Sequence, residues 1–266
     1  MKMKSLLVAM SAAALLTACG GGDDTPATSA TAATPAQIPN TATAAGYSLS
    51  VFAKAPSSTA KPDSIVQYNN TVFIGYQMAG DVKDGSVPSL TNTVVQYDLS
   101  GNVLKSYTVP GHIDGLLART DTNTLWAMSN EDANPKLTII NLATGAQKTY
   151  QATVNPTAHG GGFDDMQLLN GVVYASASNP TTPGTAAPTV VSLSLNANGT
   201  TFDVTPVLAG NAQATDITPS VGGATNPNFN KPVTLALTDP DSETIDASGN
   251  LVLDSQADGK LVFISN

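Results

Sequence analysis

Four segments of this chain repeat one order of features, and this repeat limits the fold more than any other property of the sequence. In each segment an aspartate stands at the entry of a predicted strand, and a tight turn then leads to a second, more apolar strand. The four entry aspartates are Asp63, Asp114, Asp164 and Asp241, with spacings of 51, 50 and 77 residues. A hairpin follows the second strand in the first three segments, so each repeat predicts a four-stranded antiparallel meander.

Four strands per repeat at a period near fifty residues are typical of the blades of a β-propeller. We therefore predict an all-β propeller domain of about four blades over residues 46–266; the alternative, a β-sandwich, gives no reason for the repeat. Residues 46–54 are expected to add the last strand to the final blade, whose own repeat stops after its third strand, KLVFIS. A closed four-bladed ring and an incomplete six- or seven-bladed ring both remain open.

The first eighteen residues predict that the protein is exported from the cytoplasm. Residues 1–18 carry Lys2 and Lys4 ahead of an apolar run that is too short to span a bilayer. The following motif, Leu-Thr-Ala-Cys ending at Cys19, resembles the lipobox of bacterial lipoproteins. This resemblance implies cleavage before Cys19 and acylation of it, so that the protein is anchored in the membrane of the cell envelope, at the outer membrane facing the periplasm or the exterior. The alternative is a plain secretory signal.

Composition limits the partners. Residues 19–45 contain one large aliphatic residue, Ile38, and are predicted to be a disordered tether. Removal of residues 1–18 leaves nine basic and twenty acidic residues, the wrong sign of charge for binding nucleic acid. Cys19 is the one cysteine, so no disulfide within the chain is possible, and a hydrophobic core must hold the domain together.

The repeats resemble a known group of propellers. The segment ETIDASGNLVLDSQADGKLVFI, residues 243–264, is similar to the NHL, YVTN and SMP-30/gluconolactonase-like propellers, which commonly have six or seven blades. The SMP-30-like lactonases hold a divalent cation with a Glu, Asn residues and an Asp at blade entries. This chain has an aspartate at all four entries, so that ligand set does not transfer to it.

The predicted loops differ on the two faces of the propeller. One face has tight turns, whereas the other has long loops, which is where binding sites are usually built. The long loops are residues 77–92, 129–135, 153–161, 179–188 and an insertion within 205–240.

The strands that start at the entry aspartates are expected to begin on the long-loop face. Carboxylates gathered around one mouth repel each other unless they are hydrated, protonated or bound to a hard cation such as Ca²⁺. Asp63, Asp114, Asp164 and Asp241 are therefore candidate ligands of an axial divalent cation. In the alternative interpretation each aspartate accepts hydrogen bonds from backbone N–H groups of its own turn.

Further polar residues are expected near this mouth. They are His112, His159, Glu131, Asp165 and Glu243. The two histidines, with Asp114 and Asp164, can complete a transition-metal site, although their spacing fits no compact zinc motif. Solvated loop side chains are the alternative. Trp126 alternates with apolar residues in its strand and is predicted to lie in the core.

The sequence favours a membrane-tethered binding module that takes a protein, a glycan or an ion at its long-loop face. The first alternative is a divalent-metal-dependent hydrolase that acts at the axial carboxylates, and the second is a truncated propeller without a present function. No catalytic residue is assigned, because the sequence has no GxSxG motif, no P-loop and no GxGxxG that opens a helix.

Overall fold

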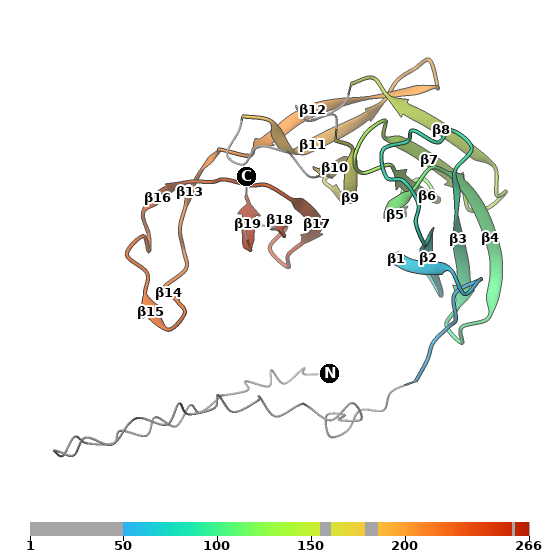
Figure 1. The fold of residues 1–266 in the computed structure, drawn as a ribbon, viewed down its shortest axis with the longest axis horizontal. Helices are drawn as coiled ribbons and strands as arrows, with labels where there is room; N and C mark the ends of the chain where they lie inside the picture. Colours follow the sequence, from blue (N-terminus) through green and yellow to red (C-terminus); the bar gives the residue numbers. More distant parts are fainter. Residues whose placement is uncertain (1–49, 155–160, 179–185, 257–258, 266) are drawn as a thin grey trace, which may run out of the picture. The chain divides into compact units, whose positions relative to one another are not determined.

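The computed structural model describes residues 50–154, 161–178, 186–256 and 259–265. The predicted signal, Cys19, the tether and His159 lie outside these residues. Ser50–Asn266 forms one compact unit. Every regular element in its described part is a strand, so the prediction of an all-β domain is confirmed (Figure 1). No helix able to cross a membrane occurs among the residues that the structure describes.

The first sheet is an antiparallel meander with its strands in chain order. Its strands are β1 (Ala60–Tyr68), β2 (Thr71–Met78), β3 (Thr91–Asp98) and β4 (Val103–Pro110). The turn between β1 and β2 places Asn69 at a φ of 52°, in the left-handed region that asparagine tolerates better than most residues. The turn chemistry read from the sequence therefore gives the expected hairpin.

The second sheet has eight strands in the order β5-β6-β7-β8-β12-β11-β10-β9. They are β5 (Ile113–Arg119), β6 (Thr124–Ser129), β7 (Lys136–Asn141), β8 (Gln147–Ala152), β9 (Phe163–Leu169), β10 (Val172–Ala177), β11 (Pro188–Leu195) and β12 (Thr201–Ala209). β5–β8 and β9–β12 are each an antiparallel meander. A short parallel contact joins them, in which Thr201 pairs with Gln151 and Phe202 pairs with Ala152.

The last sheet has three antiparallel strands, β17 (Pro240–Ile245), β18 (Leu251–Ser255) and β19 (Lys260–Ile264). The predicted insertion before it forms two small antiparallel pairs. They are β13 (Gln213–Thr215) with β16 (Pro232–Thr234), and β14 (Ser220–Val221) with β15 (Ala224–Thr225). The long loop of the sequence analysis therefore has secondary structure of its own.

Layers of buried apolar side chains join successive meanders. Between β1–β4 and β5–β8 the layer includes Phe73, Val94, Ile113, Leu125 and Ile140. Between β5–β8 and β9–β12 it includes Trp126, Met128, Phe163, Met166 and Phe202. Between β9–β12 and β17–β19 it includes Val190, Leu251 and Leu253. Trp126 is thus a core residue, as predicted. These layers place β5 next to β1 and β9, and β17 next to β9.

The structure corrects the expectation for residues 46–54. The described part of this segment, residues 50–54, forms no strand and does not extend the β17–β19 sheet. It packs on the first sheet instead, where the rings of Phe52 and Tyr97 meet edge to face with centroids 5.9 Å apart. The Tyr97 hydroxyl also donates to the Lys54 carbonyl oxygen at 3.5 Å. The edge-to-face contact of Phe52 with the buried Tyr97 holds this segment on the first sheet.

Candidate carboxylate and metal site

Each entry aspartate lies in a β-bulge of the same form. In the first bulge, Pro62 pairs with Tyr76 and Ile65 pairs with Ile74, so two residues of β1 lie opposite one residue of β2. The β5–β6, β9–β10 and β17–β18 pairs have the same extra residue on the first strand of each pair. An extra residue bends a strand and re-aims its side chains, which is a recurrent device beside binding sites. The bulged pairs are Asp63–Ser64, Asp114–Gly115, Asp164–Asp165 and Asp241–Ser242.

The bulged aspartates line two adjoining cavities of about 340 and 360 Å³. Asp63, Asp164 and Asp241 contribute to both cavities. The larger cavity is also lined by Asp114 and by residues of the loops after β2 and β6, Lys83, Glu131 and Asp132. The structure therefore brings all four entry aspartates together with residues of two predicted long loops.

Burial makes these carboxyl groups difficult to ionise. Loss of water raises the pKa of Asp63 to about 6, and the charges of Glu131 and Asp241 add to the effect. Burial, and next a hydrogen bond with Asp241, raise the pKa of Asp164 far above its usual range. Asp164 therefore keeps its proton near neutral pH, which lowers the repulsion inside the cavity.

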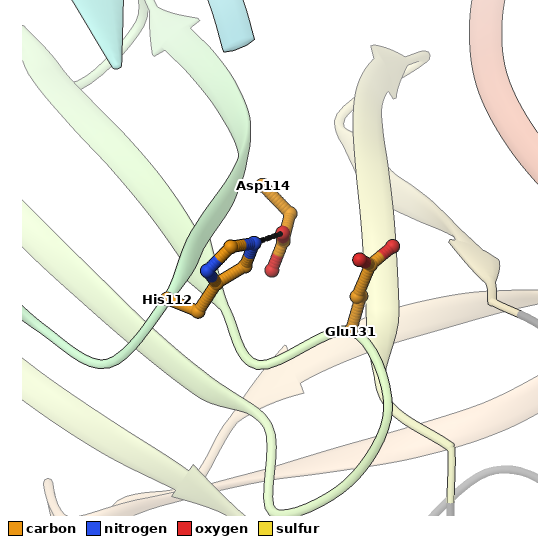
Figure 2. Close-up of side chains that lie close together, drawn as sticks. All are labelled: His112, Asp114 and Glu131. Atoms are coloured by element: carbon orange, nitrogen blue, oxygen red, sulfur yellow. Dashed lines mark ion pairs between the residues drawn. The ribbon is translucent and has the colours of Figure 1, made fainter. Parts of the chain in front are cut away.

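A second group of polar side chains gathers at one wall of the larger cavity. His112, Asp114 and Glu131 each offer a ligand atom, and these atoms all lie within 4.8 Å of one another. Figure 2 shows the Asp114 carboxylate facing an imidazole nitrogen of His112, with Glu131 on the adjoining loop. His112 Nε2 is 3.4 Å from Asp114 Oδ1. The three residues come from the entry of β5 and from the loop that follows β6.

His112 and Asp114 are buried without full hydrogen bonding. Each residue is 3% exposed. Both ring nitrogens of His112, and Oδ2 of Asp114, have no hydrogen-bond partner among the described residues. Burial lowers the pKa of His112 and keeps its ring neutral, whereas burial and the Glu131 charge raise the pKa of Asp114 well above its usual value. Buried polar atoms normally find partners, so this arrangement points to a missing one.

The backbone of this wall is held by two buried amides. The Asn130 side-chain oxygen accepts a hydrogen bond from the His112 backbone N–H at 3.0 Å. The Asn92 side-chain oxygen accepts one from the Ile113 backbone N–H at 2.9 Å. Asp81 Oδ2 lies 3.7 Å from His112 Nδ1 and accepts a hydrogen bond from Asn92 Nδ2 at 2.6 Å. The backbone at His112 and Ile113 is therefore held by Asn130 and Asn92, and Asp81 lies beside the imidazole ring.

Glu131 forms an ion pair with Lys83, which is half-exposed. Lys83 is the one basic residue among the described residues that line the larger cavity. Its hydrogen bond to Glu131 raises the pKa of Lys83. An ammonium group thus occupies the place beside Glu131 where a bound cation would be stabilised.

Two further predicted residues lie on the β9–β17 side. Asp165 accepts hydrogen bonds from the backbone N–H groups of Met166, at 2.7 Å, and Glu243, at 3.0 Å. Asp165 therefore ties the backbone of β9 to that of β17. Glu243 is 4% exposed, and neither of its carboxylate oxygens has a hydrogen-bond partner among the described residues.

Sequence reasoning missed Asp81, Lys83, Asn92 and Asn130. Asp81 and Lys83 belong to a long loop that was identified only as a loop. A loop aspartate and lysine resemble any solvated pair until the fold brings that loop to His112. Asn130 had one usable signal, since an asparagine that directly follows an apolar strand often adopts a positive φ, here 72°.

No protein-family model matches this chain. No curated protein matches it either. Three solved structures are similar in part. The computationally designed Ika4 protein matches with 11% identity and a TM-score of 0.40, over 82% of this chain and 100% of its own. A mutant of the Synechocystis apocarotenoid oxygenase has 10% identity and a TM-score of 0.35, over 79% of this chain and 50% of its own. A protein of unknown function from Bacteroides thetaiotaomicron has 10% identity and a TM-score of 0.29, over 79% of this chain and 61% of its own.

Proposed function

We propose that this chain is a β-propeller-like binding module of the cell envelope that holds a divalent cation in its carboxylate-lined cavity. The observation that carries the proposal is the set of four matching bulges, which aim four aspartates into one region. Bulges re-aim side chains and are over-represented next to active sites, and here the four re-aimed aspartates line one cavity. A divalent cation neutralises the repulsion between them.

The propeller-like part of the proposal is supported by the pairing pattern. Three four-stranded meanders and a three-stranded one follow each other along the chain, and almost all strand pairing occurs within a meander. Successive meanders meet through apolar faces, and their first strands are neighbours. Blades of a propeller pack in this way around a central channel.

The proposed localisation rests on the sequence of the first nineteen residues. Acylation of Cys19 would tether the domain to a membrane, and the excess of acid would keep it from anionic nucleic acids. The loops around the cavity are then available to a protein or glycan partner.

A second candidate is metal-dependent hydrolysis in the same cavity. It is favoured by the hydrogen-bonded Asp164–Asp241 pair, because a carboxyl group whose pKa is raised, as that of Asp164 is, can serve as a general acid. A hydrolase would lose its activity in Asp114→Ala and Asp164→Ala variants. A binding module would lose only affinity for its ligand.

Calorimetric titration of the detergent-purified, metal-stripped full chain with Ca²⁺, Mg²⁺, Mn²⁺ and Zn²⁺ tests the cation site. We expect one of these ions to bind and to raise the melting temperature, since a ligand that binds only the folded state stabilises it. Asp164→Asn should weaken this binding. Asp98→Asn, in an exposed turn where Asp98 accepts hydrogen bonds from Ser100 and Asn102, is the control and should not. The proposal fails if none of the four ions binds.

A further inference from the structure

We infer that His112, Asp114 and Glu131 form a site for a first-row transition metal such as Zn²⁺, at the wall of the larger cavity (Figure 2). This inference rests on the proposed function and gives the cation a chemical class. It differs from an axial calcium site in its ligands, because one of them is an imidazole and three of the four entry aspartates are not used.

The spacing of the donor atoms fits such an ion. Two ligand atoms at about 2.1 Å from a tetrahedral zinc lie about 3.4 Å apart. His112 Nε2 and Asp114 Oδ1 are already 3.4 Å apart. The wider limit of 4.8 Å for the whole group asks for a movement of about 1 Å to reach tetrahedral spacing. Glu131 can supply it, because its side chain comes from a loop.

The unsatisfied atoms of this group are consistent with a bound metal. The ring nitrogens of His112 and Oδ2 of Asp114 are buried and without hydrogen-bond partners in the described part of the chain. A metal between Nε2 and Asp114 would satisfy both residues at once. Metal-bound histidines usually direct their other ring nitrogen towards a carboxylate, and Asp81 lies 3.7 Å from Nδ1.

The donor set selects the class of metal. Calcium and magnesium take oxygen ligands, whereas imidazole suits zinc, copper, iron and nickel. Three protein ligands beside a cavity of about 360 Å³ leave a coordination position for water or a ligand atom. The metal must also displace the Lys83 ammonium group from Glu131.

Cobalt(II) is the direct probe, because its visible absorption reports its ligands. We expect the metal-stripped full chain to bind one Co²⁺ with visible ligand-field bands, and Zn²⁺ to displace it. His112→Gln and Glu131→Gln should each weaken Co²⁺ binding by about 100-fold. Asp98→Asn, in the exposed turn after β3, removes one negative charge but no ligand, so it is the control and should change affinity by less than about threefold.

One further variant completes the test. Glu131 lies on a loop, so Glu131→Gln keeps the test valid if His112→Gln fails to fold. Lys83→Met should tighten Co²⁺ binding by roughly two- to fivefold, because the competing ammonium group is gone.

The possible failures are distinct. If a divalent ion binds but its affinity is the same in His112→Gln and Glu131→Gln, the assignment to these residues is overturned and the proposed function stands. If neither Co²⁺, Zn²⁺ nor any other divalent ion binds, both are overturned.

Discussion

Glu243 places a carboxyl group in the β17–β18 core with no hydrogen-bond partner among the described residues. Burial, and next the charge of Asp165, raise its pKa well above the usual value of 4.5. The folded chain therefore holds a proton here that the unfolded chain releases. Stability from this group is complete below about pH 4.5 and is lost as the pH rises towards the folded pKa.

We expect Glu243→Gln to flatten the pH dependence of stability. In the presence of a chelator, the variant should gain free energy of unfolding relative to the parent as the pH rises from 5 to 8, by at most about 1.4 kcal/mol per pH unit. Urea unfolding at several pH values measures this difference. Asp246→Asn is the control, since hydrogen bonds from Asn250 lower the pKa of this exposed carboxylate. The group is ionised in the folded and the unfolded chain from pH 5 to 8, so this variant should differ from the parent by a constant amount. A constant difference between Glu243→Gln and the parent at every pH contradicts the prediction.

At the scale of the element, the bulge in β5 differs from the other three at its second residue. Serine or aspartate stands there in β1, β9 and β17, but β5 has Gly115. A Cβ at Gly115 would meet the backbone carbonyl oxygen of Asp164 in the neighbouring strand β9. The close approach of β5 and β9 therefore depends on the absence of a side chain at Gly115. The positions of Asp114 and Asp164 depend on this approach too.

Gly115→Ala should therefore lower stability by about 1–3 kcal/mol and weaken cation binding, because backbone atoms have to separate. Gly75→Ala is the comparison, since its Cβ would lie 3.1 Å from the end of the Ile113 side chain, which can adjust. Thermal melts and metal titrations of both variants measure the two effects. An equal loss in the two variants would show that the β5–β9 contact is not the cause.

The elements also show how far sequence reasoning reaches. The order of entry aspartate, strand, turn and strand predicted the position of β1, β5, β9 and β17, because the pattern is local and repeated. Residues 50–54 were misread, since their apolar side chains suit either a strand or the aromatic face around Tyr97. The metal-binding group was found only in part, because the contact between Asp81 and His112 depends on tertiary structure.

At the scale of the whole molecule, the sequence predicts a protein held at a membrane by Cys19. A Cys19→Ser chain should lose incorporation of a fatty-acid label and move from the membrane to the soluble fraction, because each buried CH₂ of an acyl chain contributes about 0.8 kcal/mol of membrane affinity. Labelling with a clickable palmitate analogue, followed by fractionation, checks both outcomes. An unlabelled parent chain would leave the plain secretory signal as the explanation.

The two-residue contact between β8 and β12 is the one strand pairing between different meanders in the part of the chain that the structure describes. Nearly every other strand pairs with its neighbour in sequence, so most loops that close during folding are short and cost little entropy. Cohesion between meanders then comes mainly from apolar side chains. Such an architecture grows by duplication of a whole meander, because a new copy needs only matching faces and no new hydrogen-bond register.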